Sequence, residues 1–384
     1  MSKKYFYNIN GIRFLLASLV LIHHVAVVTQ LNGISNFFNK LDFLKAFGPV
    51  SVSLFFALSG FLITYILLIE KKETGSISIK KFYLSRVLRI FPLYYIIITI
   101  HLFVIPYTPL HTIESKLLVG DIGIHFSDYQ LIPTWLINIL YFLLMPQVAL
   151  SLLVANGAKF IPAGHVWSIG VEEIFYLIWP LLLLRYSNKF RQLVTKLLLS
   201  YYSLIILFAI AIILIKYNIV ANKNFQISLN FSCIMFLYNR VTCMFIGAVG
   251  AYILINKPAI LQRITQKNKF ILSIVIMILL FATGIRVPFL THEFYCLFFV
   301  TIILYLIKED KKYFLENPVL NYLGKISYGI YMYQMLAIFL VTYLYKQYNF
   351  HFIIIYPLSF IVTILMASFS YELIESKFLK LKNK

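Results

Sequence analysis

The sequence predicts an all-α membrane protein, a polytopic bundle of about ten transmembrane helices. Of its 384 residues, 61% are hydrophobic and only 12% are charged, and the mean hydropathy is +0.85. A soluble domain carries roughly 25% charged residues, so this chain has too few charges to cover a soluble globule of its size. Since about 20 apolar residues cross one bilayer core, the length leaves room for little beyond spans and short loops. We therefore interpret residues 1–384 as one integral-membrane domain.

Eleven apolar runs are candidates for the spans. Each is long enough to be a membrane helix or a buried segment beside one. They cover residues 11–29, 47–69, 91–110, 134–155, 169–185, 197–216, 231–255, 270–285, 290–307, 326–345 and 352–374.

Basic residues decide how many of these runs cross. If 134–155 does not cross and the N-terminus is cytoplasmic, 24 of the 34 Lys and Arg lie on the cytoplasmic side, as the positive-inside rule requires. If 134–155 also crosses, the basic loops 185–196, 257–269 and 308–325 face outward. We therefore predict ten spans with both termini cytoplasmic, and a re-entrant or interfacial segment that Pro146 interrupts. The alternative is an eleventh span.

Charge and cysteine content argue against several other kinds of protein. The net charge of +20 would suggest nucleic-acid binding in a soluble protein, but here the cytoplasmic loops account for it. Cys233, Cys243 and Cys296 lie in apolar stretches without CxxC spacing, so we expect neither a disulfide framework nor a metal site. The first apolar run has no small-residue cleavage site after it and is interpreted as a retained signal-anchor.

Ionisable side chains inside the spans are the first functional candidates, because a charge in a bilayer is costly. Eleven helical steps separate Arg13 from His24, which puts them about 20° apart on one face with a rise of about 16 Å. A guanidinium binds phosphate or carboxylate, and an imidazole accepts a proton near neutral pH. The simpler alternative is a snorkelling arginine and a hydrogen-bonded buried histidine.

Charged residues near other spans are the next candidates. Arg86 and Arg89 lie at the cytoplasmic mouth of the third span, where they could hold an anionic donor or simply satisfy the positive-inside rule. Arg240 lies inside the run 231–255. Glu172 and Glu173 stand at the outer start of another span, where a carboxylate can pair with a histidine or an arginine or cap the helix.

Several segments together resemble the acyltransferase-3 family of membrane-bound acyltransferases. The matched motifs keep their order over nearly the whole chain. The most specific are the Arg13–His24 pair in NGIRFLLASLVLIHH, SVSLFFALSGFLIT (51–64) and HVWSIGVEEIFYLIWP (165–180). The weaker ones are SRVLRIFP (85–92), Arg240 with FIGA (245–248), LGKISYGIYMYQ (323–334) and SYELIESKF (370–378).

The chain departs from the family's pattern at four positions. They are Ser51 in place of Gly, Ser53 in place of an Asp that many members carry, Gln334 in place of a frequent His, and Lys377 in place of Pro. The change to glutamine brings into question a catalytic histidine at that position, whereas Arg13, His24 and Glu172 are retained. Some members carry a fused outer hydrolase-like domain after the last span, and we expect none here because the chain ends ten residues after Ile374.

The resemblance implies an enzyme that moves an acyl group, commonly acetyl, from a cytoplasmic coenzyme A thioester to a hydroxyl of a cell-surface glycan. The donor substrate would be acetyl-CoA, and no permanently bound cofactor is expected. The acceptor would be a glycan or lipid-linked glycan, such as lipopolysaccharide O-antigen, another surface polysaccharide or a peptidoglycan-type glycan, with a small lipid as a further option. Such an enzyme would lie in the bacterial cytoplasmic (inner) membrane among membrane lipids and bind no nucleic acid.

In that scheme His24 is the general base that deprotonates the acceptor hydroxyl, and Glu172 orients or charge-balances it or binds the acceptor. An acyl-His24 intermediate is the open alternative. The arginines at the inner face would hold the donor phosphates. The donor-binding candidates are Arg13, Arg86 and Arg89, and the acceptor-binding candidates are Trp167, Tyr176 and Arg240. Aromatic residues can stack on sugar, although at a membrane interface they also act as anchors.

Two other classes of function compete with the enzyme. A transporter or flippase for a lipid-linked sugar would use intramembrane Arg and His as substrate or proton sites. Paired broken helices and an internal repeat would favour it, but the sequence shows no repeat and only one run broken by proline. A scaffold would use the charges to fix helix packing, and His24→Ala would then lower abundance in step with activity.

Overall fold

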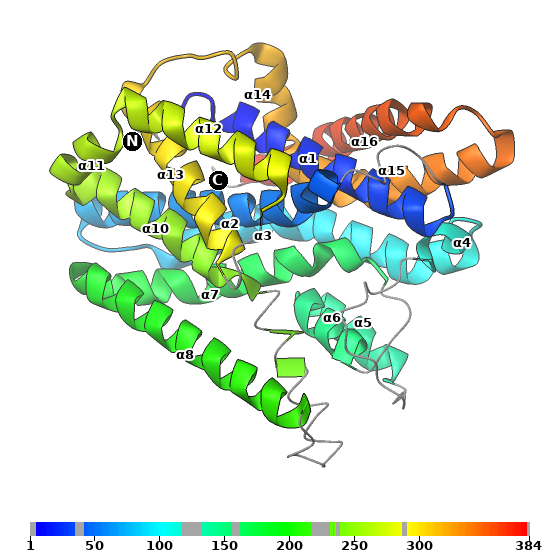
Figure 1. Cartoon of the computed structure of the whole chain (residues 1–384), viewed down its shortest axis with the longest axis horizontal. Helices are drawn as coiled ribbons and strands as arrows, with labels where there is room; N and C mark the ends of the chain where they lie inside the picture. Colours follow the sequence, from blue (N-terminus) through cyan, green and yellow to red (C-terminus); the bar gives the residue numbers. More distant parts are fainter. Residues whose placement is uncertain are drawn as a thin grey trace. The chain divides into compact units, whose positions relative to one another are not determined.

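The computed structural model describes residues 5–34, 42–116, 132–155, 162–216, 231–232, 234–235, 239–285 and 290–381. All regular elements within these ranges are helices (Figure 1), which confirms the all-α prediction. The chain forms two compact units, the first made of Met1–Ile97 and Thr242–Lys384 and the second of Ile98–Val241.

The first unit contains most of the long helices. Its core forms where α1 packs along α2, α14 and α15, where α15 packs on α16, and where α12 and α13 pack on α2 and on each other. The helices are α1 (Ile9–Leu31), α2 (Asp42–Thr74), α3 (Ile79–Thr99), α10 (Val241–Asn256), α11 (Pro258–Ile264), α12 (Lys267–Thr283), α13 (Thr291–Glu309), α14 (Pro318–Lys325), α15 (Ser327–Tyr348), α16 (Ile355–Ser370) and α17 (Ser376–Leu381).

Small residues allow close approach between helices of this unit. A Cβ atom on Gly60 would overlap the backbone of Met244, and one on Gly247 would overlap the carbonyl of Ala57, so α2 and α10 meet backbone to backbone. Such crossings at small residues are typical of membrane helices, where close packing replaces the hydrophobic effect.

The second unit begins where α3 gives way to the π-helical turn Ile100–Val104 and the 3-10 turn Ile105–Tyr107. Its α6 packs on α7, with Gly170 close against Gln147 and Pro146. The remaining elements are α4 (His111–Glu114), α5 (Thr134–Phe142), α6 (Pro146–Ala155), the 3-10 turn Gly164–Val166, α7 (Trp167–Tyr186), the 3-10 turn Ser187–Lys189 and α8 (Phe190–Lys216).

The run 134–155 is broken, as its proline predicts. It forms α5 of 9 residues and α6 of 10 residues, and Leu144 in the connection has a φ of 59°. Pro146 is the first residue of α6, where its missing N–H leaves no helical bond unmade. Neither helix has the roughly 20 residues that a crossing needs.

Seven helical stretches of the described residues are long and apolar enough to cross a membrane. An eighth is added if α10 and α11, bent by 117°, count as one span. The stretch Gly164–Ala211 has 48 residues and contains both α7 and α8, which is enough for two crossings. These helices support a multi-pass membrane protein, and the number of about ten spans is not confirmed.

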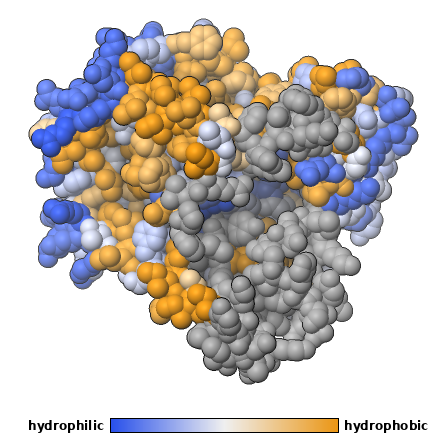
Figure 2. All heavy atoms as spheres, viewed as in Figure 1, coloured by the Kyte–Doolittle hydropathy of each residue, from blue (hydrophilic) through white to orange (hydrophobic). Residues whose placement is uncertain are grey.

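The surface agrees with a membrane setting. Figure 2 shows broad hydrophobic areas on one face of the molecule. Apolar side chains are also exposed along several of the helices, among them Leu177, Ile206, Ile278 and Leu365. Lipid tails provide the partner that such surfaces lack in water.

Two helix starts differ from the sequence prediction. The third span was expected from residue 91, but α3 begins at Ile79 and continues through Pro92. Its first turns carry Lys80, Lys81, Arg86 and Arg89, which lower the local hydropathy without breaking the helix.

The other difference concerns the expected run 231–255, in which α10 begins only at Val241. Arg240 lies directly before α10 and has a φ of 39°. This left-handed conformation is uncommon for a residue with a Cβ atom.

Candidate functional site

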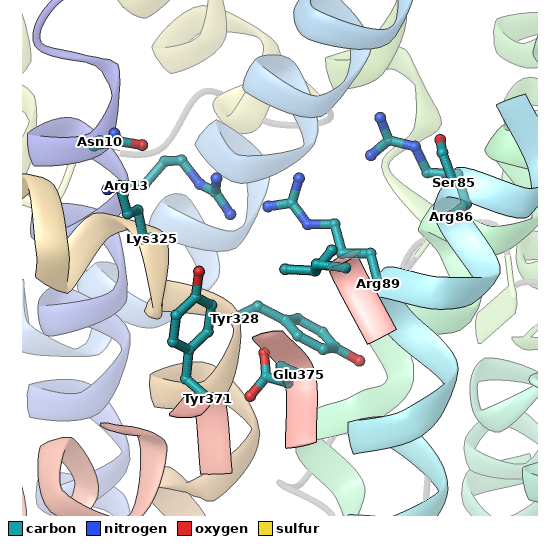
Figure 3. Close-up of a pocket in the computed structure, with 10 residues that line it drawn as sticks. Asn10, Arg13, Ser85, Arg86, Arg89, Lys325, Tyr328, Tyr371 and Glu375 are labelled. Atoms are coloured by element: carbon teal, nitrogen blue, oxygen red, sulfur yellow. The ribbon is translucent and has the colours of Figure 1, made fainter. Parts of the chain in front are cut away.

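A cavity of about 230 Å³ in the first unit brings together the three arginines that the sequence singled out as donor ligands. Figure 3 shows the guanidinium groups of Arg13 on α1 and Arg89 on α3 extending toward one another, while the guanidinium of Arg86 lies apart from these two. Two cationic groups that face each other repel unless an anion lies between or beside them. The other residues that line the cavity are Asn10, Ser85, Lys325, Tyr328, Tyr371, Glu375 and Leu379.

The start of α1, which carries Arg13, is fixed by a hydrogen-bonded clamp. The Glu316 carboxylate accepts hydrogen bonds from the Tyr5 hydroxyl at 2.7 Å, from Asn321 Nδ2 at 2.8 Å and from the backbone N–H of Asn8. The Asn8 side chain in turn donates to the Lys311 carbonyl at 2.9 Å and accepts from the Tyr313 N–H at 3.0 Å. The clamp therefore fixes the position of α1 along its own axis and its rotation about that axis.

Contacts between helices place the remaining cationic groups. A Cβ atom on Gly324 would overlap the backbone of Asn10, so the end of α14, with Lys325, lies directly against the start of α1. The Tyr328 hydroxyl donates to the Ile90 carbonyl at 3.1 Å, which ties α15 to the turn of α3 next to Arg89.

Among the described residues that line this cationic cavity, one is acidic. Glu375 ends the π-helical turn Tyr371–Glu375 that follows α16, and it is 7% exposed. Its Oε1 accepts a hydrogen bond from the Ser370 hydroxyl at 3.3 Å. π-Helical turns occur often at functional sites.

The candidate base His24 lies on α1 but does not line the cavity. Its side chain interacts with that of Gln334 on α15, and its ring centroid lies 5.5 Å from that of His23. The Nδ1 atom of His24 is buried and has no hydrogen-bond partner in the described part of the chain. Gln334 is fully buried, and its Nε2 donates to the Tyr331 carbonyl at 2.9 Å. Gln334, which replaces a histidine that is frequent in the family, therefore lies beside His24, the candidate base.

The acceptor-binding candidates, together with Glu172, belong to the second unit. The Tyr176 hydroxyl donates to Glu172 Oε2 at 2.8 Å, and the Tyr176 ring is buried. The Arg240 guanidinium lies 5.5 Å from the centre of the Trp167 ring, which also packs against an apolar cluster that includes Leu150. Since His24 belongs to the first unit, its pairing with Glu172 stays a prediction.

A buried histidine–glutamate pair in the second unit was missed by the sequence analysis. The Nδ1 atom of His101 lies 2.7 Å from Glu114 Oε1, and the His165 ring is 5.5 Å from that of His101. The same Oε1 accepts from the Ala163 N–H at 3.4 Å. His101 lies within the run 91–110, so its position inside a predicted span could have identified it; no spacing rule connects it to Glu114.

A second missed pair lies in the first unit. The Ser53 hydroxyl is 2.9 Å from Nδ1 of His292, and the neighbouring Glu293 accepts a hydrogen bond from Thr242 at 2.5 Å. Ser53 is one of the positions where the chain departs from a frequent family residue. Its partner, at the start of α13, could not be inferred from one sequence.

No metal centre is found in the described residues, where no three His, Cys, Asp or Glu side chains are grouped as an ion would require. Cys243 and Cys296 are buried, and the Cys296 thiol donates to the Ser53 carbonyl at 3.4 Å. Cys233 lies outside the described residues.

Comparison with known proteins shows the family. A model of an acyltransferase domain matches residues 6–371. The chain belongs to the acyltransferase-3 family. The peptidoglycan O-acetyltransferase OatA of Listeria monocytogenes is 31% identical over 188 residues, which are 48% of this chain and 25% of that protein.

The O-acetyltransferase OatA of Staphylococcus aureus is 25% identical to this chain over 344 residues, which are 86% of this chain and 52% of that protein. The chain thus spans about half or less of the length of these two relatives. No solved structure matches it.

Proposed function

We propose that this protein is a membrane-bound O-acetyltransferase, which moves an acetyl group from cytoplasmic acetyl-CoA to a hydroxyl of a cell-surface glycan. Membership of the acyltransferase-3 family and the similarity to two O-acetyltransferases support the reaction class. The observation that carries the donor assignment is the cavity in which Arg13 and Arg89 face one another beside Arg86 and Lys325.

The chemistry of the cavity suits the phosphorylated end of coenzyme A. Guanidinium groups match phosphate oxygens in geometry and stay charged at all relevant pH values. A volume of about 230 Å³ suits one or two phosphate groups, so the pantetheine arm with its thioester would extend out of the cavity. The basic-residue distribution supports a cytoplasmic position for this end of the helices and for both termini.

His24 is the proposed general base. It would take the proton of the acceptor hydroxyl as that oxygen attacks the thioester carbonyl, and the CoA thiolate would leave and be protonated. Glu172 would orient the histidine or bind the acceptor, and Trp167, Tyr176 and Arg240 would contact the sugar. An acyl-His24 intermediate is the variant of this scheme in which the histidine attacks first.

The acceptor class also belongs to the proposal. The name of the Listeria relative includes peptidoglycan, which favours a peptidoglycan-type glycan for this chain over lipopolysaccharide O-antigen or another surface polysaccharide. The proposed location is the bacterial cytoplasmic membrane.

The test uses the whole protein in nanodiscs with radiolabelled acetyl-CoA and glycan acceptors of each class. We expect wild-type protein to bind acetyl-CoA and transfer the label. Arg89→Gln should weaken acetyl-CoA binding by about 10- to 100-fold, since it loses a charge-assisted contact. His24→Ala should keep donor binding and lose transfer by about 10²–10⁴.

Arg185→Gln is the matched control, because Arg185 is an exposed arginine at the end of α7 that does not line the cavity. It should behave as wild type. Wild-type protein that neither binds nor consumes acetyl-CoA would contradict the donor assignment, and transport of a lipid-linked sugar would then be measured on the same preparation.

A further inference from the structure

Glu375 has no role in the proposed donor chemistry, yet it lines the donor cavity. In the described part of the chain, the cavity is lined by four cationic side chains and by this one carboxylate. A carboxylate in a site that only had to bind phosphate tightly would weaken that binding. The two negative groups repel each other, and the repulsion grows as water is excluded from the site.

The surrounding structure holds this carboxylate in place. The backbone turns with π-helical geometry from Tyr371 to Glu375, and the Ser370 hydroxyl bonds to Glu375 Oε1. On the other side, a Cβ atom on Gly329 would lie 3.5 Å from the same oxygen, so α15 passes close to it. Arg89 acts electrostatically on both Glu375 and Tyr371, and Figure 3 shows Glu375 beside Tyr371 at the cavity.

Substrate and product give a reason for such a charge. Acetyl-CoA and CoA carry the same phosphate groups, so a phosphate contact that is equally strong in substrate, transition state and product does not raise kcat. A cavity with four cations and no counter-charge would retain CoA after the transfer and slow the next turnover.

We propose that Glu375 is a built-in counter-anion, which attracts Arg89 electrostatically while the cavity is empty and competes with donor phosphate for it when the cavity fills. This inference rests on the proposed function of the cavity as the phosphate site of acetyl-CoA. Glu375 is therefore a positioning residue that lowers the affinity for both acetyl-CoA and CoA and speeds the release of CoA.

Glu375→Gln tests this proposal, because it should increase the affinity for CoA, whereas a structural defect would decrease that affinity. The variant keeps the size and most hydrogen-bonding capacity of the side chain and removes its charge. Measured at pH 8 by calorimetry in nanodiscs, Kd for CoA and for adenosine 3′,5′-bisphosphate should fall about tenfold, the size of a moderate coupling between two sites. Product inhibition by CoA should strengthen by the same factor, while the unfolding temperature of the empty protein falls and added CoA restores it.

Glu372→Gln is the matched control. Glu372 lies on the same π-helical turn and is exposed, and it does not line the cavity, so CoA binding should stay as in wild type. If Glu375→Gln does not fold, Glu375→Asp replaces it. Its carboxylate is withdrawn by one methylene group, and CoA should bind a few-fold more tightly than to wild type.

The outcomes separate the two proposals. Wild-type protein that binds CoA, together with a Glu375 variant that binds it equally or more weakly, overturns the counter-anion and leaves the donor site standing. Wild-type protein that binds neither CoA nor the bisphosphate overturns the donor site and the counter-anion with it.

Discussion

His101 Nδ1 lies 2.7 Å from Glu114 Oε1, and both side chains are closed to solvent, with exposed fractions of 0% and 1%. The glutamate also accepts a bond from the backbone of Ala163, one residue before the 3-10 turn that leads into α7. The pair thus joins the end of the third span to the start of the helix that carries Glu172 and Tyr176.

Removing Glu114 should therefore destabilise the second unit. Glu114→Ala removes the acceptor that His101 and the Ala163 N–H share, and a buried donor left without its acceptor typically costs about 1–3 kcal/mol. We expect a clear fall in the unfolding temperature in detergent, with lower yield of folded protein. Glu309→Gln breaks the exposed pair with Lys311 at 3.3 Å and serves as control; surface pairs contribute little. Equal effects of the two substitutions would contradict a stabilising role for the buried pair.

The clamp at the start of α1 should make stability depend on pH at the acid end. Burial raises the pKa of Glu316, but the hydrogen bonds from Asn8, Tyr5 and Asn321 lower it more, so the net shift is below the usual 4.5. A lowered pKa in the folded state contributes stability that is present above the unfolded-state pKa and lost as pH falls through the folded-state pKa. We expect the wild-type unfolding temperature to drop as pH falls below about 4.5.

Glu316→Gln should be less stable than wild type at neutral pH and should lose part of this acid dependence. The measurement is a set of thermal melts between pH 3 and pH 7, with Glu70→Gln as a control outside the clamp. If the unfolding temperatures of wild type and Glu316→Gln changed with pH in parallel, ionisation of the Glu316 carboxylate would not contribute to the stability of the clamp at α1. Because Glu316 is only partly buried, the effect should be modest.

Hydropathy predicted the spans well where a helix is apolar over its whole length. The run 11–29 corresponds to α1, and the run 326–345 to α15. It failed at the start of α3, because Lys80, Arg86 and Arg89 lower the hydropathy of a segment that is helical all the same. A hydropathy window measures lipid compatibility, whereas the helix continues as long as its backbone bonds and its packing allow.

The lining of the candidate cavity was predicted in part, and the role of its arginines as donor ligands stays a prediction. Family motifs identified Arg13, Arg86 and Arg89 one by one, and the structure shows that they share a cavity. Lys325 and Glu375 were missed because their place in the cavity depends on how α14 and the turn after α16 pack against α1 and α3. Helical spacing relates residues on one helix, and it carries no information about pairs on different helices.

The crossing of α2 and α10 should not tolerate added volume. Gly60→Ala would push a methyl group into the backbone of Met244, which has no flexible end to move aside. Overpacking of this kind costs about 1–3 kcal/mol, and Gly60→Leu should prevent correct folding. Lys72→Ala, at the exposed end of the same helix, should have little effect. Expression level and monodispersity on size exclusion are the measurements, and a fully folded Gly60→Leu protein would disprove the close contact.

Substitutions at Gln334, whose side chain interacts with that of His24, can distinguish the enzyme hypothesis from the scaffold hypothesis. If Gln334 orients the base, Gln334→Ala should lower kcat about 10- to 100-fold, since small misplacements of a catalytic group cost that much, while KM for acetyl-CoA stays constant because the cavity does not include this residue. Gln334→His, which restores the residue frequent in the family, should retain more activity than Gln334→Ala and shift the pH–rate profile. Gln347→Ala, an exposed glutamine on the same helix, is the matched control. The opposite outcome is that activity in both Gln334 variants falls in step with abundance, with no change in the pH–rate profile of the remaining protein. That result would favour the scaffold, because side chains that only fix packing change how much protein folds and not how the folded protein reacts.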